Sequence, residues 1–177
     1  MKLSLVLALM LLVACNQDRP QQEVPGPTVA EDEAHISQMV ASFHASLGKT
    51  LRGGGIDTDS LVDAYFDKDI YYVTPWGWTE PLDSTKSRFR KALGRIKDYD
   101  NKVEFQQAKA YGDGAYASFI LRQNSTIDGQ LLEEYLPTTW ILERRGTSWK
   151  IVRAHRSTDY ETFQQYIALQ KKREGSK

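Results

Sequence analysis

The sequence predicts an α+β domain in which helices come first and an antiparallel sheet follows. Three observations indicate this class. Apolar residues recur at helical spacing in residues 34–51, strand-like segments fill residues 102–157, and hairpin residues such as Gly112-Asp113-Gly114 separate these segments. Helices and strands that are largely segregated along a chain are typical of α+β folds.

The helices are predicted from apolar spacing and from capping residues. The first covers residues 34–51, and its apolar face consists of Ile36, Met39, Val40, Phe43 and Leu47. A short second helix is expected after Asp57 or Thr58, and a third after Asp83 or Ser84. Side chains of these types accept hydrogen bonds from the free amides of a first helical turn, so they mark helix starts.

The strands are predicted from β-branched and aromatic composition bounded by turn residues. A first strand covers residues 69–75, where Pro75 ends it. Four more strands are expected to form an antiparallel meander, over residues 102–111, 115–127, 133–144 and 148–157. Strict alternation in the last strand predicts one shared face for Trp149, Ile151, Arg153 and His155.

The N-terminus has the pattern of an exported lipoprotein. Residues 1–14 combine Lys2 with a mostly apolar run that is too short for a transmembrane helix and fits a signal peptide. The segment Leu12-Val13-Ala14-Cys15 is similar to a bacterial lipobox, which implies cleavage before Cys15 and lipidation of its thiol. The alternative is an ordinary signal peptide that happens to contain this cysteine, which is the only one in the chain.

The remaining residues divide into three parts. Residues 15–33 comprise the lipidated Cys15 and a flexible, proline-containing tether. Residues 34–158 form the folded domain, and residues 159–177 a C-terminal helix and tail. Asn16 stands where an aspartate signals inner-membrane retention in lipoproteins of Gram-negative bacteria. The expected location is therefore the bacterial cell envelope, with the protein anchored to the outer membrane and facing the periplasm.

Two segments resemble the nuclear transport factor 2-like (NTF2-like) superfamily, most closely its SnoaL-like and DUF4440-like domains. LVDAYFDKDIYYVTPWG, residues 61–77, resembles the family's passage from a short helix into the first strand. TTWILERRGTSWKIVRAHRS, residues 138–157, resembles its final hairpin. The resemblance implies a cone, in which a curved antiparallel sheet wraps around the N-terminal helices and often encloses a pocket.

A pocket of this kind gives several side chains a possible chemical role. The ligand-binding candidates are Tyr72, Trp76, Trp78, Tyr135, Arg153 and His155. Aromatic rings stack on flat or sugar-like ligands, and a guanidinium suits a carboxylate. His155 is also the candidate general acid or base, because an imidazole titrates near neutral pH. The structural alternatives are aromatics that cap the core, a solvated Arg153, and a His155 that bonds backbone at a strand end.

Other classes of function are not predicted. The formal net charge of zero lacks the basic excess of nucleic-acid-binding proteins. The three histidines have no zinc-like spacing, and neither a metal nor a cofactor is expected. Ketosteroid-isomerase relatives place a proton-transferring aspartate before the proline of the first strand. This chain has Thr74 before Pro75, which argues against that chemistry.

Three hypotheses about function remain open. The main one is a lipid-anchored domain that binds a small apolar or acidic molecule in the cone, or a protein on its sheet, without catalysis. The alternative is an isomerase, dehydratase or cyclase that uses His155 as acid or base, with Tyr72 or Tyr135 polarising a substrate oxygen. The third is a homodimer paired through its sheets, which outward-facing Phe119 and Trp140 would favour.

Overall fold

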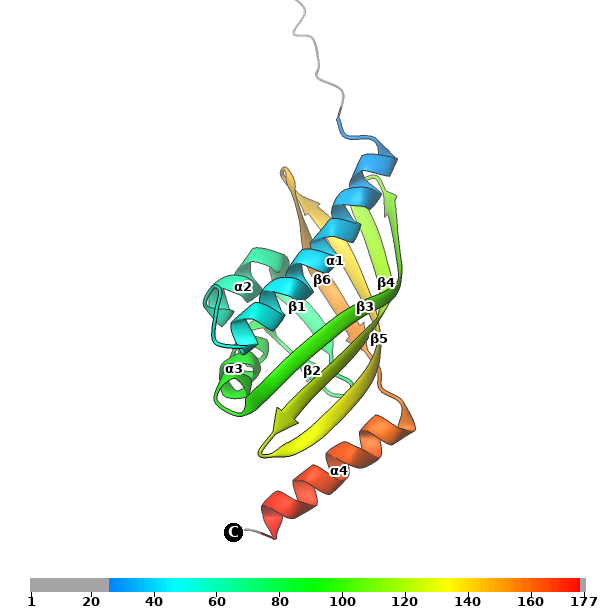
Figure 1. Cartoon of the computed structure of the whole chain (residues 1–177). Coiled ribbons are helices and arrows are strands. Elements are labelled where there is room, and N and C mark those ends of the chain that lie inside the picture. The colour runs from blue at the N-terminus through cyan, green and yellow to red at the C-terminus, as the bar shows by residue number, and fades with distance from the viewer. Residues whose placement is uncertain (1–25, 176–177) are drawn as a thin grey trace, which may run out of the picture.

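The computed structural model describes residues 26–175, which fold into four helices and one six-stranded sheet (Figure 1). The predicted signal peptide and lipobox lie outside these residues. The elements are α1 (Val29–Leu51), α2 (Thr58–Tyr65), β1 (Phe66–Val73), β2 (Thr79–Glu80), α3 (Leu82–Leu93), β3 (Ile96–Tyr111), β4 (Gly114–Ile127), β5 (Gln130–Arg145), β6 (Ser148–Arg156) and α4 (Tyr160–Glu174). None of the described helices combines the length and the apolar character needed to cross a membrane.

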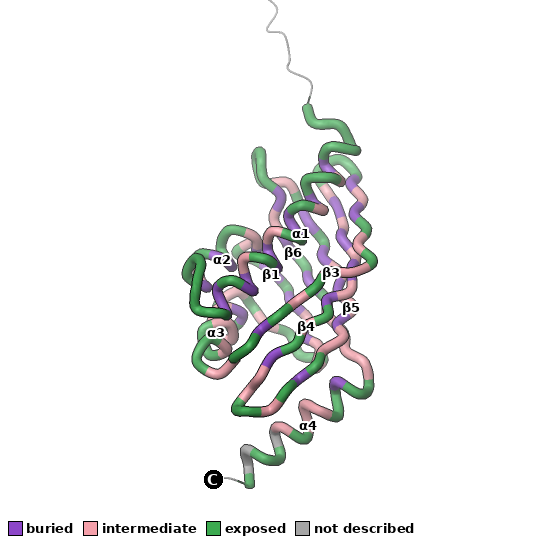
Figure 2. Tube along the Cα trace, in the orientation of Figure 1, coloured by how far each residue is buried: buried purple, intermediate pink, exposed green. Residues whose placement is uncertain are grey.

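The sheet has the strand order β2-β1-β6-β5-β4-β3. Strands β3 to β6 form the predicted antiparallel meander, and β1 lies parallel to β6 on its far side. The sheet is curved and unclosed, and α1, α2 and α3 lie against its concave face (Figure 1). Buried residues recur along the strands and along α1, as the colouring of Figure 2 shows. The predicted α+β class and the cone are therefore confirmed.

The core lies between α1 and the middle of the sheet. The ring of Trp140 in β5 meets Phe43 and Phe119 edge-on, with centroids 5.5 Å and 5.0 Å away, and stacks on His44 at 5.7 Å. Trp140 and Phe119 are 1% and 2% exposed. Both therefore face inward, and they give no support to pairing of two sheets.

The first helix begins at Val29, within the stretch that was predicted as a tether. Thr28 caps it with a capping box, which satisfies free amides of the first turn. The buried carboxylate of Asp32 pairs with Arg144 and accepts a hydrogen bond of 3.3 Å from the indole of Trp149. The end of the predicted tether is thus an ordered helical turn tied to β5 and β6.

Two further element starts were placed too late. Pro81 occupies the N-cap position of α3 without a side-chain hydrogen bond, so no capping side chain marks the true start of this helix in the sequence. The start of β3 is polar and was not recognised as a strand. Its Tyr99 is nevertheless buried, and its Asn101 donates a hydrogen bond of 3.0 Å to the backbone oxygen of His44 in α1.

One extra residue interrupts the alternation of β6. Leu142 of β5 lies opposite Ile151, but the preceding Ile141 lies opposite Arg153, so Val152 has no partner. Two residues against one is a β-bulge, which reverses the facing of every later side chain in its strand.

The bulge overturns the prediction that one face carries Trp149, Ile151, Arg153 and His155. Trp149 and Ile151 point into the core as predicted, and both are buried. Arg153 and His155 follow the bulge and are exposed on the outer face. The inward positions belong instead to Ala154 and Arg156. Side chains alternate between the two faces within each half of β6, and the alternation is broken only at the inserted Val152.

Candidate functional site

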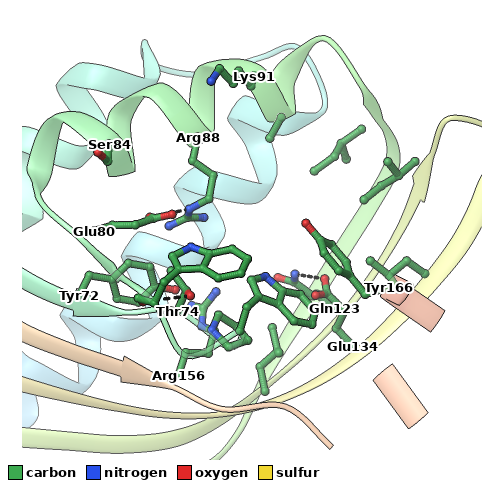
Figure 3. Close-up of a pocket in the computed structure, with 18 of the residues that line it drawn as sticks. Tyr72, Thr74, Glu80, Ser84, Arg88, Lys91, Gln123, Glu134, Arg156 and Tyr166 are labelled. Carbon is green, nitrogen blue, oxygen red and sulfur yellow. Dashed lines mark hydrogen bonds and ion pairs between the residues drawn. The ribbon is translucent and has the colours of Figure 1, made fainter. Parts of the chain in front are cut away.

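A cavity of about 500 Å³ lies between α3, the β1–β2 turn and the inner face of the sheet (Figure 3). Its volume is in the range of small-molecule sites. Its lining includes the aromatic side chains of Tyr72, Trp76, Trp78 and Tyr166 and the aliphatic side chains of Leu132 and Leu136. The three predicted aromatic candidates of the first strand and its turn, Tyr72, Trp76 and Trp78, are thus brought together at one cavity.

The turn that carries the two tryptophans is held by Thr74. Its amide and its hydroxyl both donate hydrogen bonds to the backbone oxygen of Trp78, at 3.0 Å and 3.1 Å. Gly77 has a φ of 85° in this turn, a conformation that favours glycine. Thr74, which stands where ketosteroid-isomerase relatives have a catalytic aspartate, therefore holds the turn that carries Trp76 and Trp78.

Helix α4 supplies one wall of the cavity. The ring of Tyr166 stacks on Trp76 with centroids 3.9 Å apart. The helix is held at the edge of β5 by Thr162, whose hydroxyl donates to the backbone oxygen of Glu133 at 3.3 Å and accepts from the amide of Tyr135 at 3.4 Å. Sequence reasoning predicted this helix but did not connect it to the site.

Basic side chains of α3 and of the residues just after it line one side of the cavity, and two of them are paired with carboxylates. Arg88 pairs with Glu80 of β2 at 2.9 Å, and its guanidinium lies 5.2 Å from the ring centroid of Tyr72. Figure 3 shows this pair above the cavity, with Lys91 farther along the same helix. Arg95 also lines the cavity and pairs with Asp128 at 2.7 Å.

A hydrogen-bonded carboxyl group lies on the sheet side. The amide of Gln123 donates to Glu134, and the hydroxyl of Tyr99 donates to the amide oxygen of Gln123 at 3.0 Å. Burial raises the pKa of Glu134, against the opposing effects of the Gln123 hydrogen bond and of nearby arginines. Burial also raises the pKa of Tyr99 to about 12. Glu134 can therefore keep a proton at a pH where an exposed glutamate is ionised.

Arg156 is the guanidinium that β6 turns toward the cavity. It lies beside Thr74 on the sheet side of the site (Figure 3). Its Nε is buried without a hydrogen-bond partner, and its side chain forms no ion pair with any described residue. The sequence reading assigned a ligand-binding guanidinium to Arg153, and the bulge gives that position to Arg156.

The other three predicted site residues lie outside the cavity. Tyr135 faces outward beneath Arg122, whose guanidinium is 4.8 Å from the ring centroid. Arg153 lies over Tyr71 on the outer face, at 5.6 Å. His155 borders a separate hollow of about 270 Å³ on that face. The structure therefore does not bring Tyr135, Arg153 or His155 to the site that holds the three other candidates.

No protein-family profile and no curated protein sequence matches the chain. Solved structures, however, share its architecture. An NTF2-like protein of unknown function from Pseudomonas putida is similar with a TM-score of 0.60 and 17% identity, over 77% of this chain and 94% of that chain. A proposed aromatic ring hydroxylase from Novosphingobium aromaticivorans gives 0.63 and 16%, over 75% and 92%. A proposed dehydratase of the NTF2-like family from Streptomyces avermitilis gives 0.58 and 12%, over 72% and 99%. At identities this low, the structural likeness establishes a shared fold alone.

Proposed function

Because this chain has the NTF2-like fold, as its sequence predicted, we propose that its cone cavity binds a small organic molecule. The fold hosts many functions, so the argument depends on the site. The observation that carries the proposal is an aromatic-lined cavity of about 500 Å³ into which a few polar groups, Glu134 and Arg156 among them, converge. Ligand sites commonly have this mixture of apolar walls and few placed polar groups.

Native mass spectrometry of the full chain tests this proposal. We expect a retained small molecule, or binding of compounds from a panel of flat apolar and acidic molecules. Ala92→Phe should abolish this binding, because Ala92 lines the cavity and a phenyl ring would fill it. Ala34→Phe, on the exposed side of α1, is the matched control and should bind normally. Equal binding by both variants would contradict the cone cavity as the site.

Catalysis is a second candidate, and Glu134 is the observation that favours it. A carboxyl group with a raised pKa in a cavity is suited to general acid or base catalysis. This form of the enzyme hypothesis uses Glu134 in place of His155, which faces away from the cavity. Glu134→Gln should abolish turnover of a bound compound while its binding persists. Full turnover by this variant would eliminate the catalytic role.

Membrane anchoring through Cys15 is our proposal for localisation. It is supported by the lipobox-like segment and by the apolar run before it, both of which lie outside the described residues. Cys15→Ser should move the protein from the membrane fraction to the periplasm, while Gln17→Ser should leave it membrane-bound. Intact-mass measurement should show the added mass of the lipid on the wild-type chain and no such mass on the Cys15→Ser variant. Membrane retention of Cys15→Ser would contradict lipidation.

Homodimer formation through the outer face is a further proposal. It is supported by exposed apolar side chains on that face, namely Phe105, Tyr111 and Ile141. Sedimentation velocity at micromolar concentration should give a dimer mass that Phe105→Asp halves. A monomeric wild-type protein would contradict the proposal.

A further inference from the structure

The charges that line the cavity are not balanced. Arg88 is neutralised by Glu80, and Arg95 by Asp128. The amino group of Lys91 is exposed to solvent on α3. Of the described cations that line the cavity, Lys91 and Arg156 have no ion pair, and Arg156 is the less exposed of the two.

Arg156 is half-buried, and a guanidinium in such a place without an ion pair is costly, since a charge loses part of its hydration when it leaves water. The Nε of Arg156 is buried and donates to no described group. Glu134 interacts with Arg156 electrostatically, but the two form no ion pair, and Glu134 is already hydrogen-bonded by Gln123. The charge also reaches His44, where it reinforces the effect of burial in lowering the pKa. Arg156 is therefore a half-buried cation that lines the cavity without an ion pair among the described residues.

The cavity that Arg156 lines is also lined by several aromatic side chains. Trp76 and Trp78 line it from the β1–β2 turn, Tyr72 from β1 and Tyr166 from α4. Aromatic faces favour flat partners, which they contact over a large area. A single unpaired guanidinium matches one negative charge, and its planar donor pair fits both oxygens of a carboxylate.

We propose that the ligand is an organic monocarboxylate with a flat apolar body, whose carboxylate pairs with Arg156. This inference rests on the proposed binding function and names its ligand class. The flat body lies among the aromatic side chains, and Glu134 lies on the same sheet side of the site as Arg156. A neutral analogue of the same shape loses the charge pair and keeps the apolar contacts.

The test compares 2-naphthoate with 2-naphthamide, which share size and shape and differ in charge. Binding to the full chain is measured by calorimetry and by tryptophan fluorescence near neutral pH. We expect the acid to bind at least about tenfold more tightly than the amide. Arg156→Gln should bring the two affinities together. Arg153→Gln removes an arginine from the outer face of the same strand and should preserve the preference.

The outcomes separate the inference from the function on which it rests. Equal affinities for the two probes in the wild-type chain would overturn the carboxylate inference and leave the binding function standing. A preference that survives in a folded Arg156→Gln variant would overturn the role of Arg156. No binding of either probe, with an empty cavity in native mass spectrometry, would overturn both. Should Arg156→Gln fail to fold, Arg156→Lys keeps the charge without the planar donor pair and should show a reduced preference; an unchanged preference there would count against the inference.

Discussion

Trp76, in the turn between β1 and β2, stacks on Tyr166 of α4 with ring centroids 3.9 Å apart and ring planes inclined by 19°. This contact joins the C-terminal helix to the region around the first strand. A segment that follows the meander in sequence therefore forms part of the wall of the cavity. The contact also covers one face of the Trp76 indole, which lines the cavity.

Tyr166→Ala should therefore loosen this wall. We expect the free energy of unfolding to fall by about 1 kcal/mol, because a stacked aromatic pair is lost, and the fluorescence of Trp76 to shift to longer wavelength as water reaches it. Tyr160→Ala is the control, since Tyr160 is on the same helix but 75% exposed. Denaturant titration with fluorescence detection measures both effects. Identical changes in the two variants would show that the stacking has no specific role.

His44 should make the protein sensitive to acid. Burial, and secondly the charge of Arg156, lowers its pKa well below the ordinary value of 6.5, and both ring nitrogens lack a hydrogen-bond partner. Below pH 6.5 the unfolded chain binds a proton at this residue and the folded chain does not. Stability that is fully present above pH 6.5 is therefore lost at about 1.4 kcal/mol per pH unit as the pH falls, until the pKa of the folded state is reached.

His44→Phe should remove this slope and keep the ring packing on Trp140. His35→Phe, at an exposed position of the same helix, should retain the slope. Glu134 contributes with the opposite sign, because a raised carboxyl pKa gives stability that is lost as the pH rises above 4.5. It is present in every variant, so the difference between the variants isolates His44. Melting temperatures between pH 5 and pH 7 provide the measurement, and parallel curves for wild type and His44→Phe would refute the prediction.

Asp32→Asn tests whether the first turn of α1 belongs to the folded domain. The substitution removes the buried one of the two carboxylates that pair with Arg144 and leaves only the exposed Asp113, and we expect a loss of about 3 kcal/mol. Glu33→Gln is the control, because its pair with Lys109 is more exposed and should contribute less than about 1 kcal/mol. Chemical denaturation of the full chain decides between them. A negligible effect of Asp32→Asn would show that this turn does not contribute to the stability of the folded domain.

Arg156→Gln should raise the stability of the protein in the absence of ligand. A half-buried cation without an ion pair opposes folding, and a shorter neutral amide removes that cost. We expect a gain of about 1 kcal/mol in the free energy of unfolding, whereas Arg153→Gln should change it little. A loss of stability in Arg156→Gln would show that the arginine is held for structural reasons, because binding residues commonly carry a stability cost that structural residues do not.

The sequence predicted the class and the order of all elements except the short β2, and three of its six ligand-binding candidates line the cavity. Hydrophobic periodicity identified the apolar face of α1, and turn residues separated the four strands of the meander. Tyr72, Trp76 and Trp78 could be grouped because they are close in sequence, in a segment that resembles the NTF2-like superfamily. These are short-range signals, and tertiary structure preserved them.

The other side chains that line the cavity, such as Glu134 and Arg156, are brought there by long-range geometry that the sequence does not reveal directly. Because of the bulge at Val152, Arg156 faces the cavity in place of Arg153 and His155, and no residue type in β6 indicates this bulge in the sequence. Glu134 did leave a signal, since it is the one carboxylate at the inward positions of β5 between Leu132 and Leu142. A lone acid in an apolar alternation is a better guide to a site than a histidine near a strand end.

The docking of α4 has a consequence for the solubility of the protein. Strand β6 pairs with β5 only from Thr138 onward, so the earlier half of β5 has no strand on that side. Helix α4 lies there, and Thr162 occupies two of the backbone hydrogen-bonding groups. Loss of α4 by proteolysis would uncover this strand edge, whose free backbone groups can pair with strands of other chains. Such truncated molecules would be expected to aggregate through β5 while the rest of the cone remained folded.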